Sequence, residues 1–413
     1  MLCEGTDEWA VSGSRWSPNW PSAVSTPDKA APSRPNINIF AYATTLSDTS
    51  QNENAAAYSE IRPLMVFIDV SVFMVSTANL RANQSLSLCT GETNRILPQS
   101  QRQMQADGMI RPGKTFCDLE FRHLDDLRES DVAVFGASHG SPYQPGVPSH
   151  AAGSPAAIRN ALSWYSSNPE QLDLDTMKPV FGGKTAIDCG NIDGDTRDGA
   201  ANREAIRQTT RAILSAGAVP ILIGGDDSVP IPLIETVADH MPVVVVQIDA
   251  HIDWREEIDG ERFGFSSTMR RCSEFENVRG IIQIGGRGPG SAKPSDLEEA
   301  RLWGVEFFFA RDVHRHGLDP IIAKVPERAN VVLSIDVDGL DPSVVPGVVL
   351  PAFGGLSYTQ VTEIILSVMG KANIVAANFV ELVSERDPSG LGAMAVARLV
   401  CTAIASAGKL PPT

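Results

Sequence analysis

The chain has 413 residues, of which 43% are hydrophobic and 20% are charged, so it is long enough for one large α/β domain with additional material or for two domains. Its formal net charge of −16 at pH 7 argues against a nucleic acid or an acidic membrane surface as partner, because both would require a basic face. The same acidic balance is compatible with a small cationic substrate.

Nothing in the sequence predicts secretion or membrane insertion. The chain has no apolar stretch of about twenty residues, the length that spans a bilayer. Its N-terminus lacks the basic segment and apolar core of a signal peptide. The six cysteines are scattered without a CxxC pair, which is typical of reduced thiols. We therefore expect a cytoplasmic protein.

The first quarter of the chain differs in composition from the rest. It is rich in Ser, Thr, Asn, Gln and Pro and shows little periodicity, so it would bury too little apolar surface to offset the entropy of ordering. We expect an irregular or disordered extension over residues 1–105 and an α/β domain over residues 106–413. Two alternatives stay open: an upstream translation of a gene whose product begins near Met104 or Met109, and an extension that packs on a neighbouring subunit.

From Asp131 onward, short apolar runs rich in β-branched residues alternate with stretches of helical character. This alternation predicts a three-layer α/β/α sandwich around a mostly parallel sheet of about eight strands. The expected strands are residues 132–135, 185–187, 219–223, 243–248, 280–284, 305–309, 331–335 and 374–380. The expected helices are residues 154–165, 197–216, 231–240, 295–303, 312–324, 357–369 and 390–405.

Two of the expected strands end in clusters of carboxylates. Asp249, His251 and Asp253 follow one strand, and Asp336 and Asp338 follow a later one. Residues i and i+2 of an extended chain point to the same side, so each set can converge at the carboxyl edge of the sheet, where α/β proteins bind ligands. Carboxylates this close would raise one another's pKa or destabilise the fold unless cations compensate them. Oxygen ligands with one imidazole suit a divalent ion such as Mn²⁺, and so many of them predict two ions.

A third stretch, Gly224-Gly225-Asp226-Asp227-Ser228, follows the expected strand at 219–223. Its glycines allow a sharp turn and a close approach to a ligand, although Gly-Gly-Asp-Asp alone is a common turn. DAHID at 249–253 and SIDVDGLDP at 334–342 resemble the signatures of the ureohydrolase family, which includes arginases, agmatinases and related guanidino hydrolases. GGDDS at 224–228 resembles the family's Gly-Gly-Asp-His-Ser motif. The resemblance covers roughly residues 131–405 and implies a homo-oligomer, either a trimer or a hexamer.

The resemblance also implies a site with two Mn²⁺ ions per chain. Asp249 and Asp336 would bridge the ions, and Asp253 would complete one of them. His251 and Asp338 would complete the other. The remaining ligand of the family, a histidine, falls on Asp227, whose carboxylate can also bind Mn²⁺.

The chain departs from the family at a second position. The family often carries a histidine that is thought to shuttle protons after the DAHxD motif, and here Phe265 occupies its place. Phenylalanine cannot transfer a proton. We consider His139, on the loop after the first strand, as a substitute acid–base group or substrate contact, with a satisfied loop histidine as the alternative. Asp226 and Asp341 are expected to have structural roles.

The implied activity is an agmatinase-like hydrolysis of a small cationic guanidino compound to urea and an amine. Asp253 would pass the proton of the nucleophile to the leaving amine, and Glu381 would accept hydrogen bonds from the guanidinium. The altered positions 227 and 265 keep a second hypothesis open, a non-catalytic structural or regulatory subunit. A third hypothesis, phosphoryl transfer from an Asp-x-Asp-Gly motif at 336–339, leaves DAHID unexplained.

Overall fold

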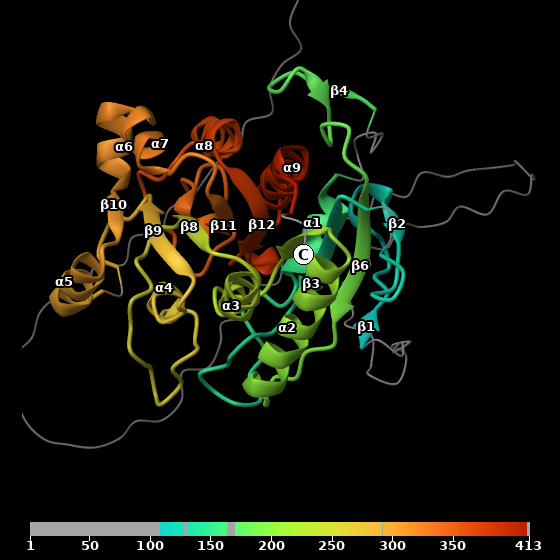
Figure 1. Cartoon of the computed structure of the whole chain (residues 1–413). Coiled ribbons are helices and arrows are strands. Elements are labelled where there is room, and N and C mark those ends of the chain that lie inside the picture. The colour runs from blue at the N-terminus through green and yellow to red at the C-terminus, as the bar shows by residue number, and fades with distance from the viewer. Residues whose placement is uncertain (1–107, 128–129, 163–169, 291, 411–413) are drawn as a thin grey trace, which may run out of the picture. The chain divides into compact units, whose positions relative to one another are not determined.

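The computed structural model describes residues 108–127, 130–162, 170–290 and 292–410 (Figure 1). The expected N-terminal extension over residues 1–105 lies outside these ranges. Within them, no helix is both long enough and apolar enough to cross a bilayer.

The core of the described chain is one large sheet. Its strand order is β1–β6–β3–β7–β12–β11–β8–β9–β10, with β2 also paired to β6. All these neighbours are parallel except β1, which runs antiparallel to β6. The strands are β1 (Met109–Ile110), β2 (Glu120–Phe121), β3 (Val132–Ala137), β6 (Ala186–Ile192), β7 (Val219–Ile223), β8 (Val243–Ile248), β9 (Val278–Ile284), β10 (Glu306–Phe308), β11 (Asn330–Asp336) and β12 (Asn373–Val380). A separate hairpin joins β4 (Leu172–Asp173) to β5 (Lys178–Pro179).

The mostly parallel sheet that the sequence predicts is confirmed, and each of the eight expected runs forms a strand. The strands β1 and β2 were not expected because each spans two residues, too few for an alternating pattern to be visible.

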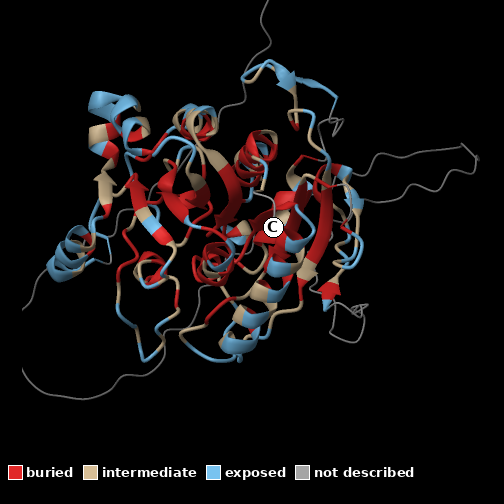
Figure 2. Cartoon of the chain, in the orientation of Figure 1, coloured by how far each residue is buried: buried red, intermediate tan, exposed pale blue. Residues whose placement is uncertain are grey.

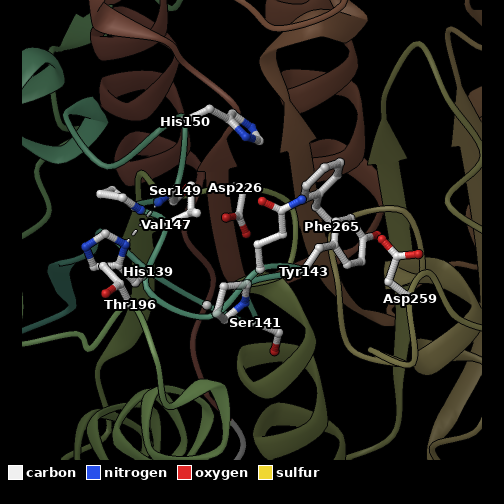
Figure 3. Close-up of a pocket in the computed structure, with 14 residues that line it drawn as sticks. His139, Ser141, Tyr143, Val147, Ser149, His150, Thr196, Asp226, Asp259 and Phe265 are labelled. Carbon is white, nitrogen blue, oxygen red and sulfur yellow. Dashed lines mark hydrogen bonds between the residues drawn. The ribbon is translucent and has the colours of Figure 1, made fainter.

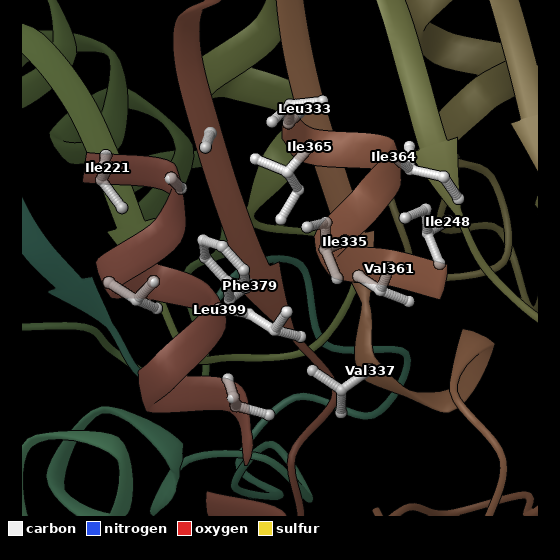
Figure 4. Close-up of a cluster of buried hydrophobic side chains, with 14 of the residues drawn as sticks. Ile221, Ile248, Leu333, Ile335, Val337, Val361, Ile364, Ile365, Phe379 and Leu399 are labelled. Carbon is white, nitrogen blue, oxygen red and sulfur yellow. The ribbon is translucent and has the colours of Figure 1, made fainter. Parts of the chain in front are cut away.

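Helices cover both faces of the sheet, as predicted (Figure 1). Aliphatic side chains of α1, α8 and α9 pack on one face, and those of α2, α3 and α4 pack on the other. Both layers of contact are buried, and the outward surface of α2 is exposed, whereas α3 and α9 are buried along most of their length (Figure 2). Figure 4 shows the first face, where Val361 and Ile365 lie beside Ile335, and Phe379 lies near Leu399 of the same cluster. The helices are α1 (Ser154–Ala161), α2 (Gly199–Ser215), α3 (Pro230–His240), α4 (Thr268–Cys272), α5 (Pro294–Trp303), α6 (Ala310–His316), α7 (Asp319–Lys324), α8 (Tyr358–Lys371) and α9 (Leu391–Ser406).

One expected helix is wrong in extent. The stretch 312–324 forms two helices, α6 and α7, because the chain turns at Gly317, whose φ of 71° is left-handed and incompatible with a continuous helix. The helix α4 was missed, since five residues carry too short a pattern to predict.

The register of the central strands places their carboxyl ends side by side. Ile248 of β8 pairs with Ile335 of β11, so the next residues, Asp249 and Asp336, leave the sheet at the same level. The strand β12 lies between β11 and β7, and Glu381 follows it directly. The two carboxylate clusters, the GGDDS loop and Glu381 therefore meet at one edge of the sheet.

Candidate active site

The glycine pair after β7 is required by the backbone. Gly224 and Gly225 have φ values of 88° and 75°, a conformation that side chains disfavour. A Cβ atom on Gly225 would lie 2.6 Å from the carbonyl oxygen of Ala137. The turn also lets the Gly225 carbonyl accept the backbone N–H of Glu381 at 2.9 Å, which links the ends of β7 and β12. The turn thus places Asp227 next to the end of β12, where its backbone N–H reaches Glu381.

The end of β8 carries three candidate ligands. Asp249 Oδ1 accepts the backbone N–H of His251 at 2.5 Å. Asp253 has a left-handed φ of 42°, which places a turn at this residue. Its backbone carbonyl accepts the N–H groups of Met269 and Arg270, so the short helix α4 fixes this turn.

The end of β11 brings two more carboxylates to the same place. Asp336 Oδ1 accepts the backbone N–H of Asp338 at 2.8 Å. Asp338 Oδ1 accepts the N–H of Ala250 at 3.0 Å, and its Oδ2 lies 3.1 Å from His251 Nδ1. Gly339 allows this approach, because a Cβ atom there would lie 2.7 Å from the backbone nitrogen of Asp249.

Two groups of side chains in the described chain could each hold a metal ion. In one group Asp249, His251 and Asp338 offer ligand atoms within 4.8 Å of one another, and in the other Asp227, Asp249 and Asp253 do so. The two groups share Asp249. Asp336 belongs to neither, although it is buried among the same carboxylates.

The electrostatics of the cluster indicate a missing positive charge. Burial and the charge of Asp253 raise the pKa of both Asp227 and Asp249 well above the usual range. Burial and the charges of Asp338 and Asp249 do the same for Asp336. Burial alone would lower the pKa of His251, but contact with Asp338 outweighs it and raises the value to about 9.

Asp227 provides the most specific test of whether a cation fits. Both its carboxylate oxygens are buried and accept no hydrogen bond, whereas buried polar atoms in proteins are nearly always paired. Its backbone N–H donates to Glu381 Oε1 at 2.8 Å, so the residue is fixed in place while its carboxylate is left for a ligand. Carboxylate oxygens with one imidazole are donors that Mn²⁺ accepts. The described residues therefore fit a divalent metal centre.

Two glutamines that we did not predict orient the cluster. Gln247 Nε2 donates to Asp249 Oδ2 at 2.6 Å, and Gln283 Nε2 donates to Gln247 Oε1 and to the carbonyl of Ile252. Both side chains are buried. The sequence held a signal, because each glutamine interrupts an apolar strand and Gln247 precedes Asp249 by two residues, which puts the two side chains on the same side.

Glu381 lies beside the carboxylate cluster in a left-handed conformation with a φ of 69°. Its Oε2 lies 2.5 Å from Nε2 of His150, which belongs to the loop between β3 and α1. Burial raises the pKa of Glu381, and the contact with His150 opposes that shift without cancelling it. His150 is a further functional candidate that sequence reasoning missed, after Gln247 and Gln283.

His139 belongs to neither of the two candidate metal groups. His139 Nδ1 accepts the backbone N–H of Ser149 at 3.4 Å, next to His150 in the chain. It lies in the wall of the same cavity as His150 and can still contact a substrate. Phe265 packs edge-on against the His150 ring, with centroids 5.2 Å apart, and against Tyr143 at 4.7 Å.

The residues expected to be structural have structural contacts. Asp226 accepts the backbone N–H and the hydroxyl of Ser228. Asp341 accepts four hydrogen bonds from Ser343, Gly354 and Gly355, which lower its pKa to about 2.

A cavity of about 350 Å³ opens over this edge of the sheet (Figure 3). Figure 3 shows Asp226 between His139 on one side and Phe265 on the other. Its ionisable lining residues are His139, Tyr143, His150, Asp226 and Asp259, and among the described residues no Lys or Arg contributes to this lining. The wall therefore suits a cationic ligand better than an anionic one.

Comparison with known proteins gives consistent matches. A family model described as the arginase family matches residues 130–406. The mitochondrial agmatinase of Gallus gallus is 31% identical over 241 residues, which cover 56% of this chain and 70% of that protein. The guanidinobutyrase of Pseudomonas aeruginosa is 29% identical over 239 residues, which cover 55% of this chain and 74% of that protein. The solved structure of proclavaminate amidino hydrolase from Streptomyces clavuligerus has a TM-score of 0.63 at 26% identity and covers 71% of this chain and 96% of that one.

Proposed function

Because the chain belongs to the arginase family, we propose that it is a metal-dependent guanidino hydrolase of agmatinase type, releasing urea and an amine. The observation that carries the proposal is the pair of carboxylate groups that share Asp249, with both oxygens of Asp227 buried and unpaired. Two Mn²⁺ ions would satisfy these oxygens and compensate the charge of the cluster.

Six residues would hold the ions. Asp227, Asp249 and Asp253 form one side, and Asp249, His251 and Asp338 form the other. Asp336, level with Asp249 at the strand ends, would add a further carboxylate. When bound, the metals would supply Lewis acidity that lowers the pKa of water to near neutrality.

The chain's own residues would perform the remaining steps. Asp253 would take a proton from the nucleophilic water and pass it to the leaving amine. Glu381 would accept hydrogen bonds from the planar guanidinium, which carries several N–H donors in a fixed arrangement. Its carboxylate is oriented for this role because Asp227 N–H and His150 hold one oxygen each.

The cavity supports a substrate with a second positive charge. Asp226 and Asp259 are the carboxylates of its wall, and described Lys and Arg side chains are absent from it. A guanidino amine such as agmatine would meet favourable charge at Asp226 and Asp259, whereas the carboxylate of a guanidino acid would meet like charge at these two residues. We therefore place agmatine-like amines ahead of guanidino acids.

A urea assay tests the proposal. The full chain is loaded with Mn²⁺ and incubated with agmatine, 4-guanidinobutyrate, arginine and guanidine in parallel. We expect about two Mn²⁺ per chain and urea chiefly from agmatine. Urea chiefly from 4-guanidinobutyrate would refute the substrate class, and bound metal without urea from any compound would favour the non-catalytic subunit.

We also propose that the protein acts as a homo-oligomer, a trimer or a hexamer, as the resemblance implies. Light scattering of the purified chain measures this directly, and a monomeric mass would contradict it.

A further inference from the structure

The hydrolysis has a proton balance that one carboxylate does not complete. As the C–N bond breaks and the C–O bond forms, both protons of the attacking water end on the departing nitrogen, which leaves as an ammonium. Asp253 can carry the first of these protons. The second requires another acid–base group that reaches both the reacting centre and the solvent of the cavity.

His150 meets this requirement on geometry. Its Nε2 lies 2.5 Å from Glu381 Oε2, the carboxylate proposed to hold the guanidinium. Its side chain is 25% exposed and lies in the cavity wall, whereas the Glu381 side chain is 9% exposed. His150 thus connects a buried carboxylate beside the reacting centre to water.

The ring of His150 is held in this position by its neighbours. Phe265 packs edge-on against it at an interplanar angle of 90°. Tyr143 supports Phe265, and its hydroxyl accepts the backbone N–H of Ser266 at 2.9 Å. On the other side, His139 accepts the N–H of Ser149 and anchors the loop one residue away. His139 therefore acts on the site through the loop that presents His150.

We infer that His150 is the second acid–base residue of this site, which gives a proton to the departing amine nitrogen and recovers one from the attacking water. The inference rests on the proposed function. The sequence motif led us to look for the proton-transfer residue at position 265, which holds Phe265. The inference assigns that role to His150 instead, on a loop far from Phe265 in the sequence.

The charges around His150 are consistent with this role. Burial lowers the pKa of His150, and Arg386 lowers it further, but contact with Glu381 and the charge of Asp226 outweigh both and raise the pKa above its ordinary value. These contacts favour the protonated imidazole, the form that can donate a proton.

The test compares His150→Asn and His150→Gln with the wild type, and His316→Asn on the exposed end of α6 serves as control. Both amides keep a hydrogen-bond donor for Glu381 but cannot transfer a proton. We expect kcat to fall by about 10²- to 10⁴-fold, the usual contribution of general acid–base catalysis, with a small change in KM. Bound Mn²⁺ and the melting temperature should match the wild type.

Two further readouts separate proton transfer from a structural role. The pH profile of kcat should lose the limb that belongs to an imidazole in both amide variants. Histidine NMR of the metal-free protein should show one imidazole signal that disappears in His150→Asn and whose pKa falls in Glu381→Gln.

The outcomes distinguish the two proposals. Wild-type urea release with unchanged kcat in both amide variants would overturn the inference and leave the proposed function intact. A rise in KM alone would assign His150 to substrate binding and would also overturn it. No urea from the wild type would reject the proposed function, and the inference with it.

Discussion

Gln247 Nε2 donates a 2.6 Å hydrogen bond to Asp249 Oδ2, and both side chains are fully enclosed by the sheet and its helices. Because Asp249 is shared by both candidate metal groups, this amide fixes the orientation of the carboxylate on which both depend.

We expect Gln247→Met to weaken Mn²⁺ binding by about 10- to 100-fold, the usual effect of losing a partner that orients a ligand. The substitution keeps the side-chain volume, so the far-UV circular dichroism should not change. Gln208→Met on the exposed surface of α2 is the matched control. Titration calorimetry gives both affinities, and equal values would show that Gln247 does not orient the site.

The substitution Asp227→Asn should stabilise the metal-free protein and destabilise the Mn²⁺-bound protein relative to the wild type. Without metal, the substitution removes a buried carboxylate that lacks hydrogen bonds, so the unfolding free energy should rise by about 1–3 kcal/mol. The melting temperature in EDTA should rise with it. With Mn²⁺, the wild type should be the more stable protein, because a ligand that binds the folded state stabilises it by mass action. Thermal scans of both proteins with EDTA and with Mn²⁺ measure the reversal. The same order of stability in both conditions would contradict a metal role for Asp227.

The ion pair between Arg159 and Asp188 should be important for folding rather than for activity. Asp188 also accepts the backbone N–H groups of Phe116 and Gly190, and both charged side chains are almost fully buried. Asp188→Ala leaves Arg159 as a buried, uncompensated charge, so we expect a loss of about 3–5 kcal/mol in urea unfolding. Glu306→Ala breaks the half-exposed contact with Lys324 and should cost less than about 1 kcal/mol. A similar loss in both variants would contradict this assignment.

Asp341 should contribute a pH-dependent part of the stability. Its folded pKa of about 2 lies below the ordinary value of 3.8, so its contribution is complete above about pH 4 and is lost as the pH falls through 2. The difference in unfolding free energy between wild type and Asp341→Asn should therefore be constant from pH 7 to 5 and should shrink at pH 3. Glu327→Gln on the exposed surface controls for the loss of one charge. A difference that grows toward acid pH would contradict the assignment.

The sequence predicts the sheet and the carboxylate cluster because both follow from local rules. Most of the apolar runs are long enough to be recognised as strands, and the i, i+2 spacing of Asp249 and His251 brings both side chains into one candidate metal group. Asp336 shows the limit of such spacing, because it lies level with Asp249 but outside both groups.

His150 could not be found by the same rules. It lies on an irregular loop without a period, and its contact with Glu381 joins residues 231 positions apart in the sequence. We chose His139 from the sequence because it follows β3 closely. In the fold it is His150 that contacts Glu381, whereas His139 accepts the backbone N–H of Ser149. Long-range contacts between loops depend on the whole fold, which local patterns do not encode.

The pairing of β8 with β11 has a consequence for when the site can form during synthesis of the chain. Asp249 and Asp338 come from strands that are neighbours in space but lie on either side of β9, β10 and the helices α5, α6 and α7 along the chain. In a nascent chain the group of Asp249, His251 and Asp338 is therefore incomplete until β11 has been made, whereas Asp227, Asp249 and Asp253 are all present earlier. A cut between β9 and β11 would separate Asp338 from Asp249 and His251, and recovery of the full Mn²⁺ stoichiometry on mixing the two fragments would report their complementation.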